Sequence, residues 1–367
     1  MPFRFRLSAP LLAALLACVN ARGEDSPPPQ PTDGAPANHA TADVIIVVGA
    51  AGEASYGEAF ASWAARWQSV AQTAGARSIL IGESGSESEP SDRERLQQAI
   101  AALAPDAAAR ELEAGPSATA QAKAPVWLVL LGHGTFSQNV AKFNLRGPDV
   151  SAEELAGWLQ PLTRPLVVIN AASSSGPFIN ALSSPNRVIV TATRSGIEQN
   201  YARFGEYLSQ TIGEPQGDID HDGEVSVLEA FLAAAAGVRD FYQSAGRIAT
   251  EHALIDDNGD GLGTPANAFR GTRVVAQPSD ASQTVDGTLA ARISLAPAAG
   301  RLPLTDEEQQ QRNAIEAELE RLRSQRSQLS EADYQAALLP HLIRLARIYQ
   351  AAETRAKEST SVDKAPQ

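Results

Sequence analysis

The chain has 367 residues, of which 43% are hydrophobic and 20% are charged, and its formal net charge is −13 at pH 7. This composition fits one soluble α/β domain with extensions and excludes a disordered or membrane-spanning protein. The acidic balance argues against nucleic acid as a partner and favours cations.

Residues 1–17 have the pattern of an export signal, because Arg4 and Arg6 precede an apolar core too short to cross a bilayer. Two processing sites fit. The segment LLAC resembles a bacterial lipobox, which would lipidate Cys18, whereas VNA would allow ordinary cleavage after Ala21. We favour the lipobox because Cys18 is the only cysteine. The expected protein is exported to the bacterial periplasm and anchored to the outer membrane of the cell envelope, and loss of the two arginines takes its net charge from −13 to −15.

A Pro-rich polar tether over 18–42 precedes a series of alternating elements. Helices are predicted where apolar residues recur at three- and four-residue spacing, and strands where short apolar runs end in turn residues. The predicted order is strand 43–49, helix 58–75, strand 78–82, helix 91–103, an inserted loop 105–124, strand 126–132, helix 151–159, strand 166–170, strand 187–193 and helix 201–212. This alternation over 43–212 predicts an α/β fold with a mostly parallel sheet and helices on both faces, with functional groups at the carboxyl ends of the strands.

Two of these strands end in small residues with chemically useful neighbours. VWLVLLGHG, 126–134, places His133 between Gly132 and Gly134. The flanking glycines leave the backbone bare, which suits an imidazole presented to a substrate, with the Gly134 N–H free to stabilise an oxyanion. The second strand end, VINAASSSG, contains Ala172 and Ser173.

A hydrophobic strand ending in His-Gly, followed roughly thirty to forty residues later by one ending in Ala-Cys, is the pattern of the caspase, legumain and gingipain cysteine peptidases. Residues 43–212 resemble this group, in a legumain- or metacaspase-like form. The resemblance implies that His133 belongs to the catalytic dyad and that the Gly134 N–H helps to hold the oxyanion. The cysteine is replaced, by Ala172 if the strands are aligned and by Ser173 if the following Ser-Gly is aligned. Without a thiol, the chain is not a cysteine peptidase.

A serine hydroxyl is a far weaker acid than a thiol, so it needs a base that is itself oriented by a third group. No such carboxylate is evident, and the G-x-S-x-G elbow of serine hydrolases is absent from the sequence. We therefore expect a non-catalytic pseudo-peptidase that binds a peptide or protein ligand. The alternative is a hydrolase in which Ser173 attacks and His133 acts as the base.

The most specific motif is DIDHDGEVSVLE, 218–229, which matches a calcium loop of the EF-hand type. Gly223 permits the sharp turn at loop position 6. The expected calcium ligands are Asp218, Asp220, Asp222, the Glu224 carbonyl, a water held by Ser226, and both carboxylate oxygens of Glu229. Since GEPQG replaces the end of an entering helix, we expect a solitary loop of extracellular type, within an extension of the domain over 213–275.

A second stretch, DDNGDGLG, presents Asp256, Asn258, Asp260 and Gly261 in the same phase. Its position 12 is Asn267, so this loop has no bidentate acid of its own. It is predicted to hold a weaker ion or to form a hydrogen-bonded turn, and the sequence leaves both open.

Residues 276–303 have the composition of a linker with room for one short strand, and 304–357 are predicted to form a helical hairpin before a tail at 358–367. A capping box opens the first helix, and Pro340 is expected to kink or divide the second. Apolar stripes of this kind usually pack against each other, but docking or self-association through the hairpin stays open. A third hypothesis is therefore an envelope scaffold that acts through its C-terminal helices.

Overall fold

The computed structural model describes residues 42–83, 90–104, 124–220, 223–275, 285–297 and 304–362. The chain separates into two units, Met1–His39 and Ala40–Gln367, and every described residue belongs to the second unit. The export signal, Cys18, nearly all of the tether and Asp222 lie outside the described residues. Predictions that involve them remain predictions.

A seven-stranded sheet forms the centre of the domain, in the order β11-β10-β8-β7-β3-β1-β2. Strands β2, β1, β3, β7 and β8 are parallel to one another, and β10 and β11 add an antiparallel edge. This confirms the predicted α/β fold with a mostly parallel sheet. The strands are β1 Asp43–Val48, β2 Arg77–Ile81, β3 Val126–Leu131, β7 Leu166–Asn170, β8 Arg187–Thr191, β10 Leu254–Asp256 and β11 Thr264–Pro265.

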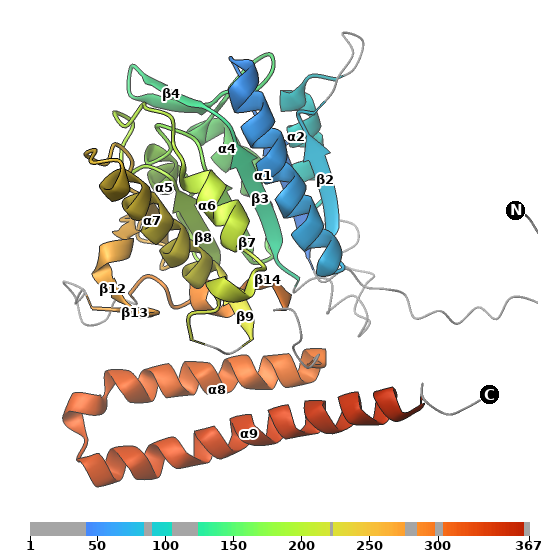
Figure 1. Cartoon of the computed structure of the whole chain (residues 1–367), viewed down its shortest axis with the longest axis vertical. Coiled ribbons are helices and arrows are strands. Elements are labelled where there is room, and N and C mark those ends of the chain that lie inside the picture. Colours follow the sequence, from blue (N-terminus) through green and yellow to red (C-terminus); the bar gives the residue numbers. More distant parts are fainter. Residues whose placement is uncertain are drawn as a thin grey trace, which may run out of the picture. The chain divides into compact units, whose positions relative to one another are not determined.

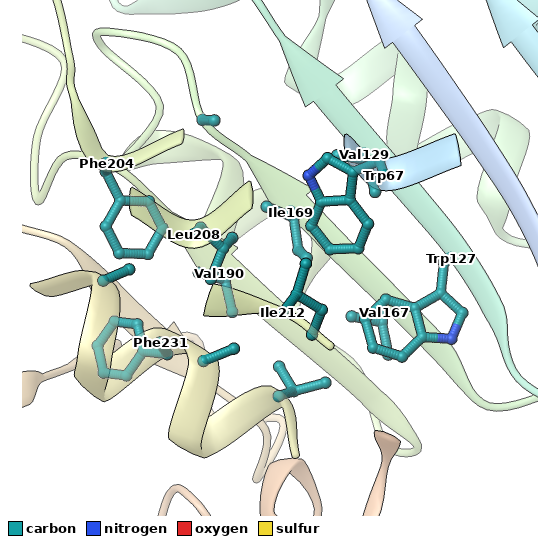
Figure 2. Close-up of a cluster of buried hydrophobic side chains, with 14 of the residues drawn as sticks. Trp67, Trp127, Val129, Val167, Ile169, Val190, Phe204, Leu208, Ile212 and Phe231 are labelled. Atoms are coloured by element: carbon teal, nitrogen blue, oxygen red, sulfur yellow. The ribbon is translucent and has the colours of Figure 1, made fainter. Parts of the chain in front are cut away.

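Helices cover both faces of this sheet (Figure 1). Of the described helices, α1 Ala54–Thr73, α6 Phe204–Thr211 and α7 Val227–Ser244 lie on one face, and α2 Asp92–Ala101, α4 Ala152–Leu159 and α5 Pro177–Leu182 lie on the other. Successive strand side chains point to opposite faces, so the apolar run of β3 supplies Val129 to the first layer and Leu128 to the second. Figure 2 shows the first layer, where Trp67 from α1 lies near Trp127 from β3.

Capping boxes mark where several helices begin. At Ser91 and Ser151, where two of the predicted helices begin, the serine hydroxyl accepts the N–H of a glutamate three residues on, whose carboxylate accepts the serine N–H. The same arrangement opens α7 at Ser226. Each cap satisfies backbone donors that have no partner inside the helix, and this explains why these boundaries could be predicted from the sequence.

Several short elements were not predicted. A three-stranded antiparallel sheet, β4 Gly134–Ser137, β5 Val140–Phe143 and β6 Val150–Ser151, follows β3 directly. Its hairpin turns at Gln138 and Asn139, which both have positive φ, as a two-residue turn between twisted strands requires. The other short strands pair as β9 Glu224–Ser226 with β14 Ser294–Pro297, and β12 Phe269–Arg270 with β13 Arg273–Val274. Of these four, only β14 was expected, as the one short strand allowed for within 276–303. Strands this short have no readable period.

The segment expected to be a linker is partly integrated into the domain. In its described part, 285–297, Asp286, Ala290 and Leu295 are buried, and β14 pairs with β9. Residues 276–284 and 298–303 lie outside the description.

The predicted hairpin consists of α8 Asp306–Ser324 and α9 Glu331–Val362. Ile315 and Leu319 of α8 are buried with Ile348 of α9. Pro340 lies inside α9, so of the two expected effects, a kink or a division of the helix, division is wrong. Contacts of α9 with α8 on both sides of the proline offset the backbone hydrogen bond that it removes. Among the described helices, none is both long and apolar enough to cross a membrane.

Candidate functional site

The two predicted motifs leave the sheet side by side. β3 and β7 are parallel neighbours in which Leu130 pairs with Asn170, so the residues three positions further on, His133 and Ser173, emerge at the same edge. The Gly134 N–H donates to Ser173 Oγ at 3.3 Å, and this hydroxyl donates to the Gly134 carbonyl at 3.1 Å. We call this place the strand-exit site, defined by His133, Gly134, Ala172 and Ser173.

Gly134 cannot be replaced without moving the backbone. A Cβ atom at this position would lie 2.2 Å from the Ser173 carbonyl oxygen, far inside van der Waals contact. Glycine is therefore required at this position, because the segments after β3 and β7 approach each other closely. Its N–H was expected to be free for an oxyanion, but in the structure this N–H is bonded to Ser173.

His133 is held among aromatic rings. Its imidazole meets Tyr56 and Phe60 of α1 edge-on, at centroid distances of 4.9 and 5.1 Å, and Tyr201 at 6.2 Å. Its Nε2 lies 3.2 Å from the Ala51 carbonyl oxygen. Because a carbonyl can only accept, this contact places a proton on Nε2 and leaves Nδ1 as the basic nitrogen of the neutral ring.

The residues after β7 differ in direction. Ala172 is 1% exposed and packs in the layer of α2, α4 and α5, whereas Ser173, 3% exposed, turns its hydroxyl to Gly134. Ser174 has a positive φ of 56° and a buried hydroxyl without a hydrogen-bond partner, and the Ser175 hydroxyl lies 3.2 Å from Thr193 Oγ1. In this part of the structure, the imidazole of His133 and the hydroxyl of Ser173 form no hydrogen bond with each other.

Sequence reasoning missed a carboxylate–imidazole pair beside this site. Glu198, in the loop after β8, accepts from the Ser174 N–H through its carbonyl, and its carboxylate lies 2.6 Å from His252 Nδ1. The same carboxylate is 3.1 Å from Arg194 Nε. His252 lies outside the strands predicted from the sequence, and the antiparallel return of β10 brings it beside the loop after β8.

His252 and Arg194 also line a pocket of about 580 Å³. It lies between α7 and the segments that flank β10, and Arg239 and Arg247 contribute further positive charge. The carboxylate of Glu251, also in the lining, accepts hydrogen bonds from the N–H groups of Arg203 and Phe204. The pocket residues are Ala192, Arg194, Phe204, Leu232, Ala235, Ala236, Val238, Arg239, Tyr242, Gln243, Arg247, Ala249, Glu251, His252, Ala253, Leu254, Pro265, Ala266, Asn267 and Phe269.

The first acidic loop brings predicted ligands together. One carboxylate oxygen each from Asp218, Asp220 and Glu229 lie within 4.8 Å of one another. Gly223 has a φ of +87°, and its N–H donates to Asp218 Oδ2 at 3.0 Å, which closes the turn. Burial raises the pKa of Glu229, and the charge of Asp220 raises it further, against the lowering effect of hydrogen bonds from Ser226 and Asp220. Three hard oxygen donors at this spacing suit calcium.

Glu224, at position 7 of this loop, is 8% exposed and lies in an ion pair. Its Oε2 accepts from Arg312 Nη2 at 3.0 Å and from Ser294 Oγ at 2.8 Å. Arg312 is 2% exposed, and its Nε lies 3.6 Å from Glu316. The predicted role of Glu224, to offer its carbonyl oxygen, leaves the side chain free to make this pair with α8.

The second acidic loop is shaped by its own side chains. Asp260 accepts from the Leu262 N–H at 2.7 Å and from Asn258 Nδ2 at 3.1 Å, while Asn258 Oδ1 accepts from the Asp260 N–H at 2.8 Å. The predicted hydrogen-bonded turn is thus present. Asn267, at position 12, is exposed.

Comparison with known proteins gives matches among solved structures. No family model and no curated protein matches the chain. The chain is similar to the Drosophila initiator caspase Dronc, with 12% identity and a TM-score of 0.37 over 62% of this chain and 83% of that one. It is also similar to caspase-1 from Spodoptera frugiperda, with 13% identity and a TM-score of 0.35 over 60% and 87%. Raptor from Chaetomium thermophilum matches with 12% identity and a TM-score of 0.25 over 42% and 15%. The similarity is one of fold, and neither activity nor ligand is carried over from it.

Proposed function

We propose that this protein is an exported, caspase-like peptidase homologue without a working nucleophile, which acts at the cell envelope by binding a peptide or protein ligand. In this proposal, calcium binds to the first acidic loop and stabilises it. The strand-exit site is what remains of the catalytic centre.

The main support for this proposal is that the Ser173 hydroxyl is hydrogen-bonded to the backbone of Gly134. A nucleophilic serine must pass its proton to a base while its oxygen faces the substrate. Here the hydroxyl is buried and bonded to both the N–H and the carbonyl of Gly134, and the Nε2 of His133 is directed at Ala51. The Ser173 hydroxyl meets its hydrogen-bonding needs within the backbone of Gly134, which favours a structural role for this serine.

Labelling with a fluorophosphonate probe tests the proposal against the hydrolase alternative. We expect the mature protein to label no more than the variant Ser173→Ala. Labelling of the wild type that disappears in Ser173→Ala and His133→Ala, but persists in the neighbouring control Ser174→Ala, would establish the hydrolase. The control is matched because the Ser174 hydroxyl is equally buried and has no hydrogen-bond partner.

The pocket beside α7 is the proposed ligand site. It reaches the strand-exit site through Glu198, which touches His252 on one side and the Ser174 N–H on the other. Its lining contains Arg194, which is paired with Glu198, Arg239, which is paired with Asp240, and the exposed Arg247. This surplus of guanidinium groups favours a ligand with carboxylate groups. Selection of displayed peptides on the immobilised mature chain should enrich acidic sequences, and Arg247→Glu, an exposed position, should abolish the enrichment. Equal enrichment on both proteins would reject this pocket.

Calcium at the first loop is part of the proposal, and its ligands would be Asp218, Asp220, Asp222, the Glu224 carbonyl and Glu229. The clustering of three carboxylates supports it, since their mutual repulsion is relieved by a divalent cation. Bound calcium would supply stability to the loop and to the start of α7, with no part in bond breaking.

The lipid anchor is proposed from the LLAC sequence alone. Metabolic labelling with a palmitate analogue should mark the wild type and leave Cys18→Ser unmarked. An unlabelled wild-type protein that begins after Ala21 would instead indicate simple secretion.

A second candidate function, scaffolding through the hairpin, is favoured by an exposed apolar patch on α9. Leu339, Leu342 and Ile343 are 57%, 45% and 43% exposed. If this patch binds a second copy or another protein, Leu339→Glu should dissociate the complex in size-exclusion chromatography with light scattering. A monomer for both wild type and variant, with an unchanged set of cross-linked partners, would reject the scaffold.

A further inference from the structure

The second acidic loop contains a buried carboxylate oxygen that lacks a hydrogen bond. Asp256, at loop position 1, is 1% exposed. Its Oδ1 accepts from Ser183 Oγ at 3.1 Å and from the Gly259 N–H at 3.3 Å, but its Oδ2 has no hydrogen-bond partner among the described residues. Burying an unpaired carboxylate oxygen is costly, so this position calls for a cation or another donor.

Asp286 reaches this loop from a distant part of the chain. Its Oδ1 accepts from the N–H groups of Asp257 at 3.0 Å and Asn258 at 3.3 Å, and its Oδ2 accepts from Thr264 Oγ1 at 2.6 Å. These three residues are positions 2, 3 and 9 of the loop. Asp286 is 4% exposed, so its carboxylate is enclosed with the loop.

The closing acid of the first loop makes the same contacts. Glu229 Oε1 accepts from the N–H groups of Ile219 at 2.8 Å and Asp220 at 3.1 Å, and its Oε2 accepts from Ser226 Oγ at 2.8 Å. These are again positions 2, 3 and 9. Asp286 therefore stands in the second loop where Glu229 stands in the first.

The carboxylates of Asp256 and Asp286 both accept hydrogen bonds from N–H groups of this one loop, Asp256 from Gly259 and Asp286 from Asp257 and Asn258. Burial raises the pKa of Asp256, and the negative charge of Asp286 raises it further. Burial also raises the pKa of Asp286, with a smaller contribution from the charge of Asp260. Like charges enclosed in this way are stabilised by a bound cation.

We propose that Asp256, Asn258, Asp260 and Asp286 form a second calcium site, in which Asp286 supplies the closing carboxylate. The loop's own position 12, Asn267, is then not required. The donors are all oxygens, as calcium prefers, and the unpaired Asp256 Oδ2 becomes a ligand. This site stands independently of the strand-exit site and of the first loop.

The side chain of Asp260 has to rotate before it can bind calcium. Asp260 now bonds to Leu262 and Asn258, and within the described residues only the first loop holds three carboxylates whose ligand atoms all lie within 4.8 Å. Asp260 is exposed, so its side chain can rotate at little cost. The second site is accordingly the weaker of the two.

Equilibrium dialysis with radioactive calcium on the mature chain tests the proposal. We expect two ions per chain for the wild type and for Asn267→Ala, and one for Asp286→Asn and for Glu229→Gln. Since Asp286→Asn removes a buried hydrogen-bond acceptor, the exposed variant Asp260→Asn serves as a second probe and should weaken the same site at least tenfold. Circular dichroism in chelator identifies any variant that fails to fold.

The outcomes separate this site from the first loop. One ion in the wild type that is lost in Glu229→Gln and kept in Asp286→Asn and Asp260→Asn would overturn the second site and leave the first. One ion lost in Asp286→Asn and kept in Glu229→Gln would do the reverse. Two ions in folded Asp286→Asn, with unchanged affinity in Asp260→Asn, would also overturn the proposal.

Discussion

The strand-exit site and the first acidic loop both contain residue types that are common in catalytic or binding sites. They differ in how the polar side chains are stabilised. At the strand exit, the hydroxyl of Ser173 is satisfied by the backbone of Gly134, without any charge. In the loop, Asp218, Asp220 and Glu229 bring like charges together in a small space. The first arrangement is stable as it stands, whereas for the second we propose that a cation from solution stabilises it.

This contrast shows how a functional group differs from a structural one in the same fold. A polar group with all its hydrogen bonds made inside the protein contributes to rigidity and offers little to a ligand. Carboxylates that repel one another keep their affinity for a ligand of opposite charge. The following four predictions test this difference, beginning with the largest expected effect.

Loss of the Arg312 charge should damage the loop region most. Arg312→Met leaves Glu224 buried without its cation, and breaking a buried pair on one side costs about 3–5 kcal/mol. The midpoint of urea unfolding should fall accordingly. The control is Arg355→Met, which removes a solvent-exposed partner of Glu308 and should change the midpoint little. Equal effects of both variants would show that the charge of Glu224 does not depend on α8.

Gly134→Ala should test how tightly the strand exit is packed. The added Cβ meets the Ser173 carbonyl oxygen at 2.2 Å, so the backbone has to shift, at a cost of about 1–3 kcal/mol. Thermal unfolding measures the loss. Gly157→Ala in α4 is the matched control, since nothing lies within 4 Å and alanine favours the helix by about 0.5–1 kcal/mol. A stable Gly134→Ala protein would mean that the two strand exits are not held together.

Calcium should stabilise the protein through the first loop. A ligand at ten times its Kd adds about 1.4 kcal/mol to the free energy of unfolding, and extracellular loops of this type bind at about 10⁻⁴–10⁻³ M. Millimolar calcium should therefore raise the Tm by a few degrees, and magnesium should raise it less. Glu229→Gln should remove the part of the calcium-dependent rise in Tm that comes from this loop, and Asn267→Ala should leave that rise unchanged. A Tm that responds to neither calcium nor chelator would reject the cation sites.

The smallest effect is expected at the serines of the strand exit. Ser173→Ala removes two hydrogen bonds to Gly134 and should cost about 1 kcal/mol. Ser174→Ala removes a buried hydroxyl without a partner and should be neutral or slightly stabilising. Urea unfolding of the two variants compares them directly. A larger loss in Ser174→Ala would contradict the assignment of the structural hydroxyl to Ser173.

The parallel sheet could be predicted because its strands are long apolar runs bounded by turn residues. The helices α2 and α4 could be placed because a serine and a glutamate three residues apart form a capping box at each start. The strands β4 to β6 could not, because they have two to four residues and mixed polarity. Their existence depends on the turn at Gln138 and Asn139 and on packing against the end of β3.

The candidate sites divide in the same way. His133 and Ser173 could be paired from the sequence because each ends a strand, and parallel strands end at one edge of a sheet. Whether Ala172 or Ser173 faces the exit was open, because a shift of one residue reverses the direction of a side chain. The structure turns Ala172 into the core and Ser173 toward Gly134.

The sequence by itself determined the fold class, the strand exits and the first acidic loop, because each is encoded in a local pattern: apolar runs that end in turn residues, or acidic residues at fixed spacing. Only the tertiary structure decided which groups meet across long separations. Glu198 lies beside His252, Arg312 beside Glu224, and Asp286 beside the second loop. No local pattern encodes these pairs, since each depends on burial and on the paths of chain segments that fold back onto the sheet.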